Sequence, residues 1–549
     1  MQGTADSSLG HSRAGPGFGI DRGFALASAV ALAAVCGLMW LAGWHSRGWI
    51  SAWPRFQDDA YYYLVIARNV AAGHGFTMDQ LSPTNGFQPL WLWLLVPVAR
   101  FTNGDTALFL GVAQGICVAL FAAGGGLLCG FLRARLGLVP ALLCGFVLLF
   151  PRFLNIYVSG VEAALVLLIL AALVIEAVRS DALSRTEPRA ADARVGLLAG
   201  LLMLARLDSV FLGVALAGYV ALHGIARGEG GFAARLWRTL CKELALFWPT
   251  LALVVPYLAW NLLSFGHFVP ISGTVKSSFP EASFNPGLVG VEYAVLLLVA
   301  LGAAAREIWR GNGRDPLVIV VGVLSIGLLL HALHTTLYMR WAVFAWHFAV
   351  FVPIGALGLA ILARERAARL SRAGVAGALC LLAAFLAVAE SVSISRMSRE
   401  FTVSGREAGI WAAKELPADA VLGMKDSGIF SYFSRRRVMN LDGVANSFEF
   451  ATAVCSGELE NFVRSHGVEY VVQHNVPHRV RNGAYETFVQ VYPCHLRGGR
   501  DGELVLRRDH EVYRGSPYAN YLGDLGQLVI WRLAPRDSEP VHDLRDSPG

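Results

Sequence analysis

The segment Pro54–Phe101 reads PRFQDDAYYYLVIARNVAAGHGFTMDQLSPTNGFQPLWLWLLVPVARF and joins the first long apolar run of the chain to the second. Two adjacent carboxylates, Asp58 and Asp59, begin a helical stretch, Ala60–Ala72, which the glycines after it terminate. Capping explains one Asp, because its carboxylate accepts backbone N–H bonds. Neighbouring helix positions point about 100° apart. The pair therefore predicts two tasks: one side chain caps a helix or holds an ion, and the other faces a cavity.

A second, shorter helix is expected in the same segment. Residues 84–86 (TNG) are turn formers, and Pro89 is a favoured first helical residue. The run Leu90–Ala99 that follows is apolar but too short to span a bilayer, a length typical of interfacial or re-entrant segments. The three consecutive tyrosines of the first helix are typical of a membrane interface. The segment therefore predicts a polar site at a lipid–water boundary.

The whole chain has the composition of a membrane protein. Its 549 residues are 55% hydrophobic and 16% charged, whereas soluble domains average about 25% charged residues. This balance excludes an ordinary soluble enzyme, a coiled coil, a collagen-like chain and a disordered chain. The basic residues, which give a net charge of +6, lie between apolar runs and form no groove-like patch, so we expect no nucleic-acid partner.

A membrane-spanning helix needs about 20 predominantly apolar residues. About eleven runs are candidates, and one of them, Val195–Ala205, is short enough to be half of a broken helix. The candidates are Phe24–Trp44, Thr106–Leu132, Leu138–Ile156, Val161–Val178, Val195–Ala205, Val210–Ile225, Leu244–Leu263, Leu288–Ala304, Pro316–His334, Ala342–Ala363 and Ala373–Ala389.

The distribution of Lys and Arg predicts the orientation of these spans. Basic residues gather in alternate loops, around 133–135, 179–194, 227–242, 306–314 and 364–372, and are isolated in the opposite loops. Loops rich in Lys and Arg are cytoplasmic. We therefore expect a multi-pass protein of the inner (plasma) membrane, with a cytoplasmic tail (1–23), a transmembrane domain (24–390) and an outer first loop (45–87).

The chain after residue 390 is different in character, because no part of it could span a bilayer. Its mixture of short strands and a helix predicts an extracytoplasmic α/β domain over 391–549. Cys455 and Cys494 lie in this domain, and the sequence leaves open whether they form a disulfide. The strands are expected at Ala420–Lys425, Arg437–Leu441 and Val468–Gln473, and the helix at Glu458–His466.

Several motifs occur in a specific order along the chain. They are DDAYYYLVIARN…TNGFQPLW in the first loop, SGVE (Ser159–Glu162), LARLD (Leu204–Asp208), PISGTVK (Pro270–Lys276) and KDSGIFSYF…NLDG (Lys425–Gly443). In this order the chain resembles the GT-C membrane glycosyltransferases: uncharacterised bacterial members and, more distantly, the mycobacterial arabinofuranosyltransferases. The resemblance implies an enzyme that moves a sugar from a polyprenyl-phosphate donor to a cell-envelope glycan, lipid or protein. Asp59 stands where the mannosyl and aminoarabinose transferases of this family commonly have Glu.

The implied reaction assigns roles to individual residues. Asp58 matches the first acid of the family's pair and is the first candidate for the general base that takes the acceptor's hydroxyl proton. Asp59 is the second candidate, with a helix cap as its alternative role. Lys276 is a candidate for stabilising the departing phosphate, the alternative being a solvated loop lysine. Arg340 is either a phosphate ligand or an interfacial anchor.

Three further charged residues lie near predicted membrane depth, where a charge is costly. Glu162 is therefore a candidate substrate-binding residue. Arg206 and Asp208 are candidates as well, the alternative being that they neutralise each other at a helix break. His74, which follows the first loop helix, is a fourth candidate.

No metal site is recognisable from cysteine or histidine spacing. His331 and His334 share one helical face and could hold a metal ion, but such histidines are more often interface or packing residues. A divalent cation, Mg²⁺ or Mn²⁺, is left open with Asp58 as a ligand, because carboxylates suit these ions.

A multi-span transporter or flippase for a lipid-linked or polar solute is the alternative function. Such a protein would carry its key charges near the bilayer midplane, often in two related halves. This chain shows no related halves, and its charges cluster towards one face, which favours the enzyme.

Overall fold

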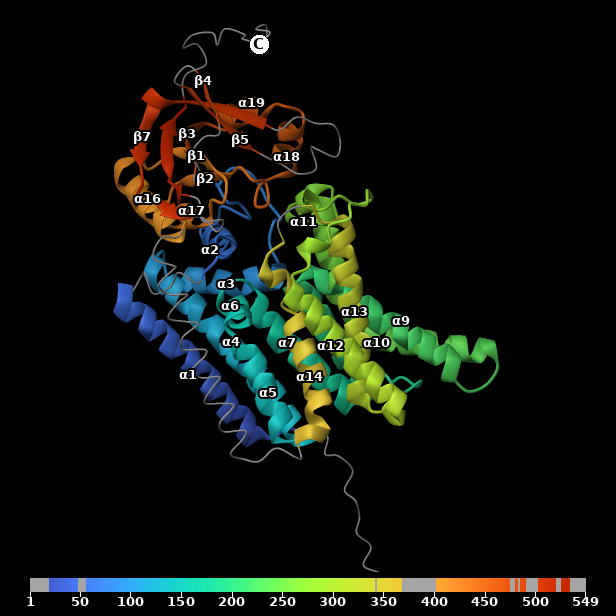
Figure 1. The fold of residues 1–549 in the computed structure, drawn as a ribbon. Coiled ribbons are helices and arrows are strands. Elements are labelled where there is room, and N and C mark those ends of the chain that lie inside the picture. The colour runs from blue at the N-terminus through green and yellow to red at the C-terminus, as the bar shows by residue number, and fades with distance from the viewer. Residues whose placement is uncertain are drawn as a thin grey trace, which may run out of the picture.

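The computed structural model describes residues 19–47, 56–340, 343–367, 401–473, 479–481, 484–489, 502–519 and 525–533. A bundle of helices forms one part, and an α/β domain lies on the end of the bundle where the first loop is found (Figure 1). This arrangement confirms the predicted fold class, a helical membrane domain followed by a C-terminal α/β domain.

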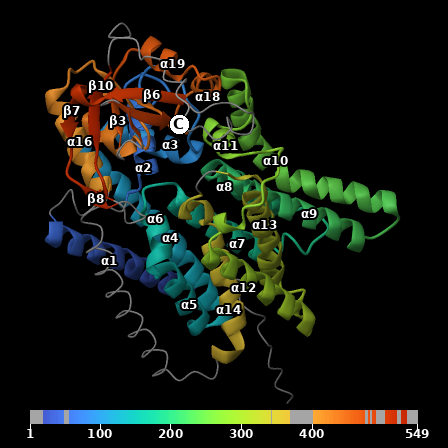
Figure 2. The same ribbon diagram turned by 45° about the horizontal axis from the view of Figure 1, so that its top comes forward.

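Most of the described chain between residues 22 and 367 is helical. Two of these helices, α9 and α10, form a hairpin that projects from the side of the bundle (Figure 2). The bundle helices are α1 (Arg22–Arg47), α4 (Thr106–Leu136), α5 (Leu138–Leu149), α6 (Pro151–Val158), α7 (Ala163–Arg179), α8 (Ala190–Ala205), α9 (Val210–Arg227), α10 (Phe232–Phe265), α12 (Val291–Glu307), α13 (Pro316–Tyr338) and α14 (Phe351–Ala367).

Five helices of the described chain are long and apolar enough to cross a membrane: α1, α4, α9 with its preceding turn, α10 and α13. The pair α5 and α6, bent by 69°, makes a sixth. Four other predicted spans coincide with α7, α8, α12 and α14, which have 16 or 17 residues. The predicted span Ala373–Ala389 lies outside the described residues, so the total of about eleven stays a prediction.

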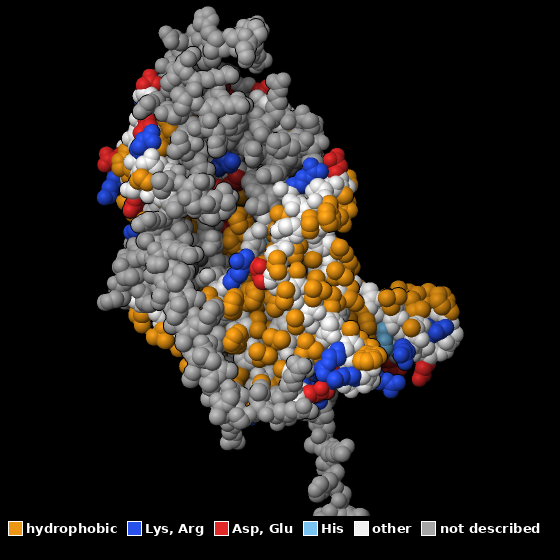
Figure 3. Space-filling model, in the orientation of Figure 1, with side chains coloured by type: hydrophobic (Ala, Val, Ile, Leu, Met, Phe, Trp, Pro, Cys, Tyr) orange, Lys and Arg blue, Asp and Glu red, His pale blue; other side chains and the backbone are white. Residues whose placement is uncertain are grey.

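The outer surface of the bundle is apolar, as lipid contact requires. Large apolar side chains such as Leu244, Trp248 and Leu263 of α10 are exposed. Figure 3 shows hydrophobic side chains over much of the bundle surface that is described in this view, with several Lys and Arg near its lower end. Together with the apolar helices, this surface identifies a multi-pass membrane protein.

Small residues allow a close contact between α1 and α4 of the bundle. A Cβ atom on Gly126 of α4 would lie 2.6 Å from the carbonyl oxygen of Ala25, and one on Gly130 would lie 2.5 Å from the Cβ of the same alanine. Glycine at these two positions lets α1 and α4 pack backbone to backbone, a common contact between membrane helices.

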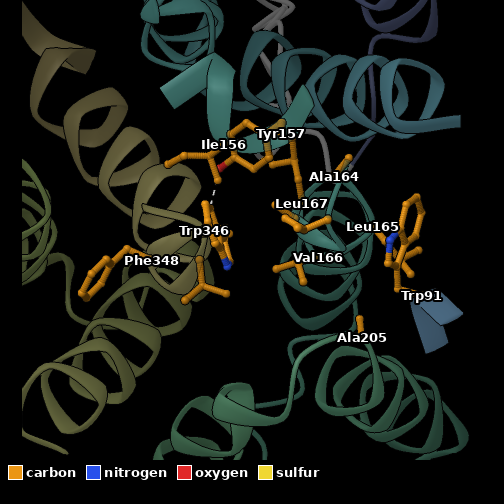
Figure 4. Packing of buried hydrophobic residues seen from close by; sticks show 14 of the residues in the cluster. Trp91, Ile156, Tyr157, Ala164, Leu165, Val166, Leu167, Ala205, Trp346 and Phe348 are labelled. Atoms are coloured by element: carbon orange, nitrogen blue, oxygen red, sulfur yellow. Dashed lines mark hydrogen bonds between the residues drawn. The ribbon is translucent and has the colours of Figure 1, made fainter. Parts of the chain in front are cut away.

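The first loop contains the two short helices that the sequence predicts. α2 (Asp58–Ala71) lies beneath the α/β domain, and α3 (Pro89–Phe101) begins at its proline (Figure 1). Trp91 of α3 is fully buried, and its indole N–H donates to the carbonyl of Gly160. Figure 4 shows this tryptophan beside Leu165 of α7 in the apolar core. The core thereby fixes the first loop against the SGVE turn.

The C-terminal domain is built on a five-stranded sheet in the order β2-β1-β3-β10-β7. β1 is parallel to β2 and β3, and β10 is antiparallel to β3 and β7. The elements are α16 (Phe401–Glu415), β1 (Val421–Met424), α17 (Gly428–Ser434), β2 (Arg437–Asn440), α18 (Phe448–Cys455), α19 (Leu459–Ser465), β3 (Val468–Gln473), β4 (Arg479–Arg481), β5 (Ala484–Val489), β6 (Gly502–Arg507), β7 (Glu511–Arg514), β8 (Tyr518–Ala519), β9 (Leu525–Gly526) and β10 (Val529–Arg532).

The strands and the helix predicted from the sequence correspond to β1, β2, β3 and α19, so these expectations are confirmed. Strands β4, β5 and β6 form a separate antiparallel sheet, and β8 pairs with β9. Cys455 is disulfide-bonded, while Cys494 lies outside the described residues.

Candidate active site

A cavity of about 660 Å³ lies where the first loop, the break between α8 and α9, α13 and the short helix α11 (Ile271–Lys276) meet. Its charged residues are Asp59, Glu162, Arg206, Asp208 and Lys276, all named as candidates from the sequence. Much of the remaining wall is apolar and comes from α8, α9, α10 and the chain after α10: Met203, Val210, Phe211, Val254, Leu258 and Phe268. The cavity therefore offers charged and apolar surfaces to the same ligand.

Asp59 lies in the first turn of α2 and contributes to the cavity wall. Burial raises the pKa of Asp59 to about 6; the Lys276 ammonium acts in the opposite direction, and the carboxylates of Asp442 and Asp426 add to the increase. A carboxyl group whose pKa is near the working pH is suited to accept a proton.

Asp58 does not line the cavity, although it is the neighbour of Asp59. Its two carboxylate oxygens accept hydrogen bonds from the backbone N–H groups of Gly428 (2.9 Å) and Ile429 (2.8 Å), at the start of α17. Burial and the charge of Asp426 raise the pKa of Asp58, and the two amide bonds oppose this. The expectation that the two acids have different surroundings is confirmed, but the residue facing the cavity is the second candidate base and not the first.

A buried ionic group closes the inner end of the site where the helix breaks. α8 ends at Ala205, and Arg206 is extended, with φ −156° and ψ 114°. Its guanidinium donates to Asp208 through Nε (2.9 Å) and Nη2 (2.8 Å), and to Glu162 through Nη1. The predicted pairing of Arg206 with Asp208 at a helix break is therefore confirmed, with Glu162 as a third member. These contacts engage all three nitrogens of the guanidinium.

Two residues of the first loop hold this ionic group in place. The hydroxyl of Tyr63 donates to Glu162 (3.0 Å) and accepts the backbone N–H of Gln88 (3.2 Å). The side-chain oxygen of Gln88 accepts the backbone N–H of Leu207 (3.1 Å), inside the helix break.

Lys276 is the remaining cation on the cavity wall. Its side chain is 8% exposed and has no salt bridge in the described part of the chain. Its Nζ lies 5.7 Å from the centre of the Phe344 ring. The first loop holds its helix, because the N–H of Ile271 donates to Asn85 Oδ1 (2.9 Å). The alternative of a solvated loop lysine is therefore wrong.

Two predicted substrate-binding residues do not reach the cavity wall. His74 is exposed in the turn after α2, with its backbone N–H bonded to Asn69. Arg340 follows α13; its backbone N–H donates to the carbonyl of Lys276 (3.1 Å), but its side chain is not part of the wall. The structure thus brings together Asp59, Glu162, Arg206, Asp208 and Lys276, and leaves Asp58, His74 and Arg340 outside.

The histidines on α13 do reach the cavity. His331 and His334 both line it, and His331 Nε2 lies 3.7 Å from Asp208 Oδ2. Within the described ranges no group of three or more His, Cys, Asp or Glu side chains is arranged to hold a metal ion. A divalent cation at Asp58 stays a prediction.

Sequence reasoning missed Tyr63, Gln88 and Asn85 as parts of the site. Asn85 and Gln88 belong to the TNGFQPLW motif, where a turn and a helix start already explained polar residues. Tyr63 follows Asp59 by four positions, a spacing that places both on one helical face, and this signal could have identified it. Val444 of the C-terminal domain also lines the cavity.

Comparison with known proteins adds information on the fold. Residues 394–513 match a family model described as "Domain of unknown function (DUF8728)". No curated protein sequence matches the chain. The structure is similar to that of ArnT from Cupriavidus metallidurans bound to undecaprenyl phosphate, with 12% identity and a TM-score of 0.52 over 93% of this chain and 99% of that chain. It is less similar to the archaeal oligosaccharyltransferase AglB from Archaeoglobus fulgidus in complex with an inhibitory peptide and a dolichol-phosphate, with 13% identity and a TM-score of 0.45 over 81% of this chain and 69% of that chain.

Proposed function

We propose that this chain, which has the fold of the GT-C membrane glycosyltransferases, moves a sugar from a polyprenyl-phosphate donor to an acceptor hydroxyl of the cell envelope. The observation that carries the proposal is the cavity that sets the partly buried Asp59 and the buried cation Lys276 on a wall continued by apolar side chains. A lipid-linked sugar phosphate needs all three: a base for the acceptor, a cation for the phosphate and an apolar surface for the isoprenoid.

The similar structure supports the choice of donor. ArnT from Cupriavidus metallidurans was solved with undecaprenyl phosphate, a polyprenyl phosphate. In this chain α9 and α10 contribute part of the apolar wall, and their side chains Val214 and Val255 are exposed on the bundle surface. A lipid carrier would thus reach the site from the bilayer.

The reaction can be written with these residues. The acceptor oxygen attacks the anomeric carbon of the sugar while the Asp59 carboxylate takes the hydroxyl proton. The bond between the anomeric carbon and the phosphate oxygen breaks, and its electron pair leaves with the polyprenyl phosphate. The Lys276 ammonium stabilises the negative charge that develops on the leaving phosphate. Arg206, whose nitrogens are already engaged, holds Glu162 and Asp208 in place.

The proposal places this chemistry on the outer face of the inner membrane. The alternating Lys and Arg content of the loops supports that orientation, and it makes the α/β domain extracytoplasmic. The acceptor is then an envelope glycan, lipid or protein. The role of a divalent cation is a separate hypothesis, tested by measuring transfer with a chelator and with Mg²⁺ or Mn²⁺ added back.

Glycan profiling of a deletion strain tests the proposal. We expect one envelope sugar to disappear in the deletion strain and to return with the wild-type gene. Asp59→Asn should fail to restore it. The matched control is Asp419→Asn, since this aspartate is exposed in the C-terminal domain away from the cavity. Full restoration by Asp59→Asn would overturn the assignment of the base.

A transfer assay in detergent separates the enzyme from a flippase. Purified protein in micelles, given a synthetic polyprenyl-phosphate sugar and an envelope acceptor extract, has no bilayer across which to move a lipid. Turnover that needs Asp59 under these conditions supports the transferase. A protein that restores the sugar in cells but is inactive in micelles with every donor and acceptor supplied would support the flippase.

A further inference from the structure

We propose that Asp58 is a positioning residue, through which the α/β domain holds the helix that presents Asp59 to the cavity. This inference deepens the proposed function and rests on it for the role of Asp59. It assigns different tasks to two adjacent and chemically identical side chains.

Asp58 contacts the α/β domain directly. Each of its carboxylate oxygens accepts one backbone N–H, from Gly428 and from Ile429. The approach is so close that a Cβ on Gly428 would lie 2.1 Å from the backbone oxygen of Asp58. The carboxylate is therefore directed at the α/β domain, and the residue that faces it must be glycine.

Tyr62 also contacts the α/β domain, one helical turn after Asp58. Its hydroxyl donates to Asp442 Oδ2 (3.1 Å). It also accepts the backbone N–H of Ser427 (3.2 Å) and the side-chain amide of Asn440 (3.2 Å). Asp442 is held in turn by the N–H of Val444 (3.0 Å). Tyr62 thus connects α2 to Ser427, which follows β1, and to Asn440 and Asp442 at the end of β2.

The spacing of these residues divides α2 into two faces. Asp58 and Tyr62 are four residues apart and both contact the α/β domain, although Tyr62 also contributes to the cavity wall. Asp59 and Tyr63 are also four apart, and this second face meets the cavity wall and Glu162. Because the faces belong to one rigid helix, fixing the first sets the direction of the second.

The topology of the α/β domain explains where α2 is held. The residues that contact it follow the carboxyl ends of the parallel strands β1 and β2. Open α/β sheets bind their ligands at this edge. In this chain the edge is occupied by α2, so the domain acts on the membrane-facing site through a helix and not through a ligand of its own.

A second contact supports the same arrangement. A Cβ on Gly86, in the turn before α3, would lie 2.0 Å from the carbonyl oxygen of Val444. The α/β domain thus contacts this segment at α2 and again at the turn before α3. A displacement of about 1 Å in a reacting group can cost on the order of 10² in rate. Loss of the contact between Asp58 and the α/β domain should therefore reduce turnover without removing the base, Asp59.

Asp58→Asn tests the inference, with Asp59→Asn and the exposed Asp419→Asn as comparisons. The asparagine keeps one acceptor oxygen and sets an NH₂ group against a backbone N–H donor. We expect kcat to fall on the order of 10- to 100-fold, with the donor KM within about twofold. The acid limb of the pH profile should stay near pH 6, where Asp59 titrates. Asp59→Asn should lose the limb together with the activity.

Hydrogen exchange provides a measurement that needs no catalysis. In Asp58→Asn, amide exchange in a peptide covering 426–432 should speed up at least tenfold, whereas Asp59→Asn and Asp419→Asn should exchange at the wild-type rate. Unchanged exchange in Asp58→Asn would overturn the contact. Loss of the acid limb in Asp58→Asn, with Asp59→Asn still active, would make Asp58 the base and overturn the positioning role. If the wild type transfers no sugar, the proposed function fails, while exchange still decides whether Asp58 holds the domain.

Discussion

Replacing Lys276 by Met removes a cavity cation for which the described residues provide no salt bridge, and it keeps the apolar stem of the side chain. Lys276 has two effects in the proposed reaction. Its ammonium binds the donor phosphate, and its charge lowers the pKa of Asp59. We therefore expect Lys276→Met to change both the use of the donor and the pH dependence of transfer.

The size of the first effect follows from the surroundings of the lysine. Its side chain is 8% exposed, and the described residues supply no salt bridge that could replace the phosphate as its partner. A hydrogen bond to a charged group contributes about 1.5–3 kcal/mol. At 1.4 kcal/mol for each factor of ten, kcat/KM for the donor should fall about 10- to 150-fold.

The direction of the second effect follows from the sign of the charge. The wild-type rate should fall as the pH decreases through about 6, where Asp59 becomes protonated. Without the ammonium the pKa of Asp59 rises, so the acid limb should move to higher pH. Stability should change little or increase, because a buried cation without a partner costs free energy.

The assay compares Lys276→Met with Lys276→Arg in nanodiscs, using one synthetic donor over pH 5 to 8, with melting temperatures measured in parallel. Arginine keeps the charge and should retain the wild-type position of the acid limb. Equal kcat/KM for all three proteins, with one common pH profile, would refute the role of Lys276 in both steps. A large loss of melting temperature in the Met variant alone would show that the lysine serves the fold.

Three further outcomes are expected. The wild-type rate at saturating donor should decrease towards low pH with a midpoint near 6, because Asp59 must be ionised to take a proton. A rate that does not change from pH 5 to 8 would contradict the role of Asp59 as the base. Arg206→Met leaves Glu162, which is 2% exposed, without its ion-pair partner. Breaking a buried pair costs roughly 3–5 kcal/mol, so the melting temperature of the variant in detergent should fall clearly. An unchanged melting temperature would show that the pair contributes little to stability. Gly86→Ala places a methyl group 2.0 Å from the carbonyl oxygen of Val444. Overpacking of this kind costs about 1–3 kcal/mol, so limited proteolysis between the bundle and the α/β domain should be faster than in the wild type. Cleavage at the wild-type rate would contradict this expectation.

Local signals in the sequence predicted much of the architecture. Hydrophobic run length indicated the long helices, and the alternation of strands with polar turns indicated β1, β2 and β3. Pro89 marked the start of α3, and the short run ending at Ala205 marked the broken helix. These features depend on residues close together in the chain, which is why a single sequence contains them.

The division of tasks between Asp58 and Asp59 could not be predicted in this way. The partners of Asp58 are 370 and 371 residues away, and no periodicity reports a contact over that distance. The family resemblance favoured Asp58 as the base because Asp58 matches the first acid of the family's pair by its position in the sequence. Position in the sequence carries no information on the surroundings of a side chain. His74 was named because it follows the first loop helix, and Arg340 because a guanidinium after an apolar span suits a phosphate, but neither residue lines the cavity.

The separation of 370 residues between Asp58 and Gly428 also has a consequence in time. At about 5–20 residues per second, synthesis of the intervening chain takes roughly 20–70 s. During that interval α2 has been synthesised but lacks the domain that orients it. A chain that ends before Gly428 would therefore hold the charged cavity residues without the contact that aligns Asp59, so the proposed reaction would require almost the whole polypeptide.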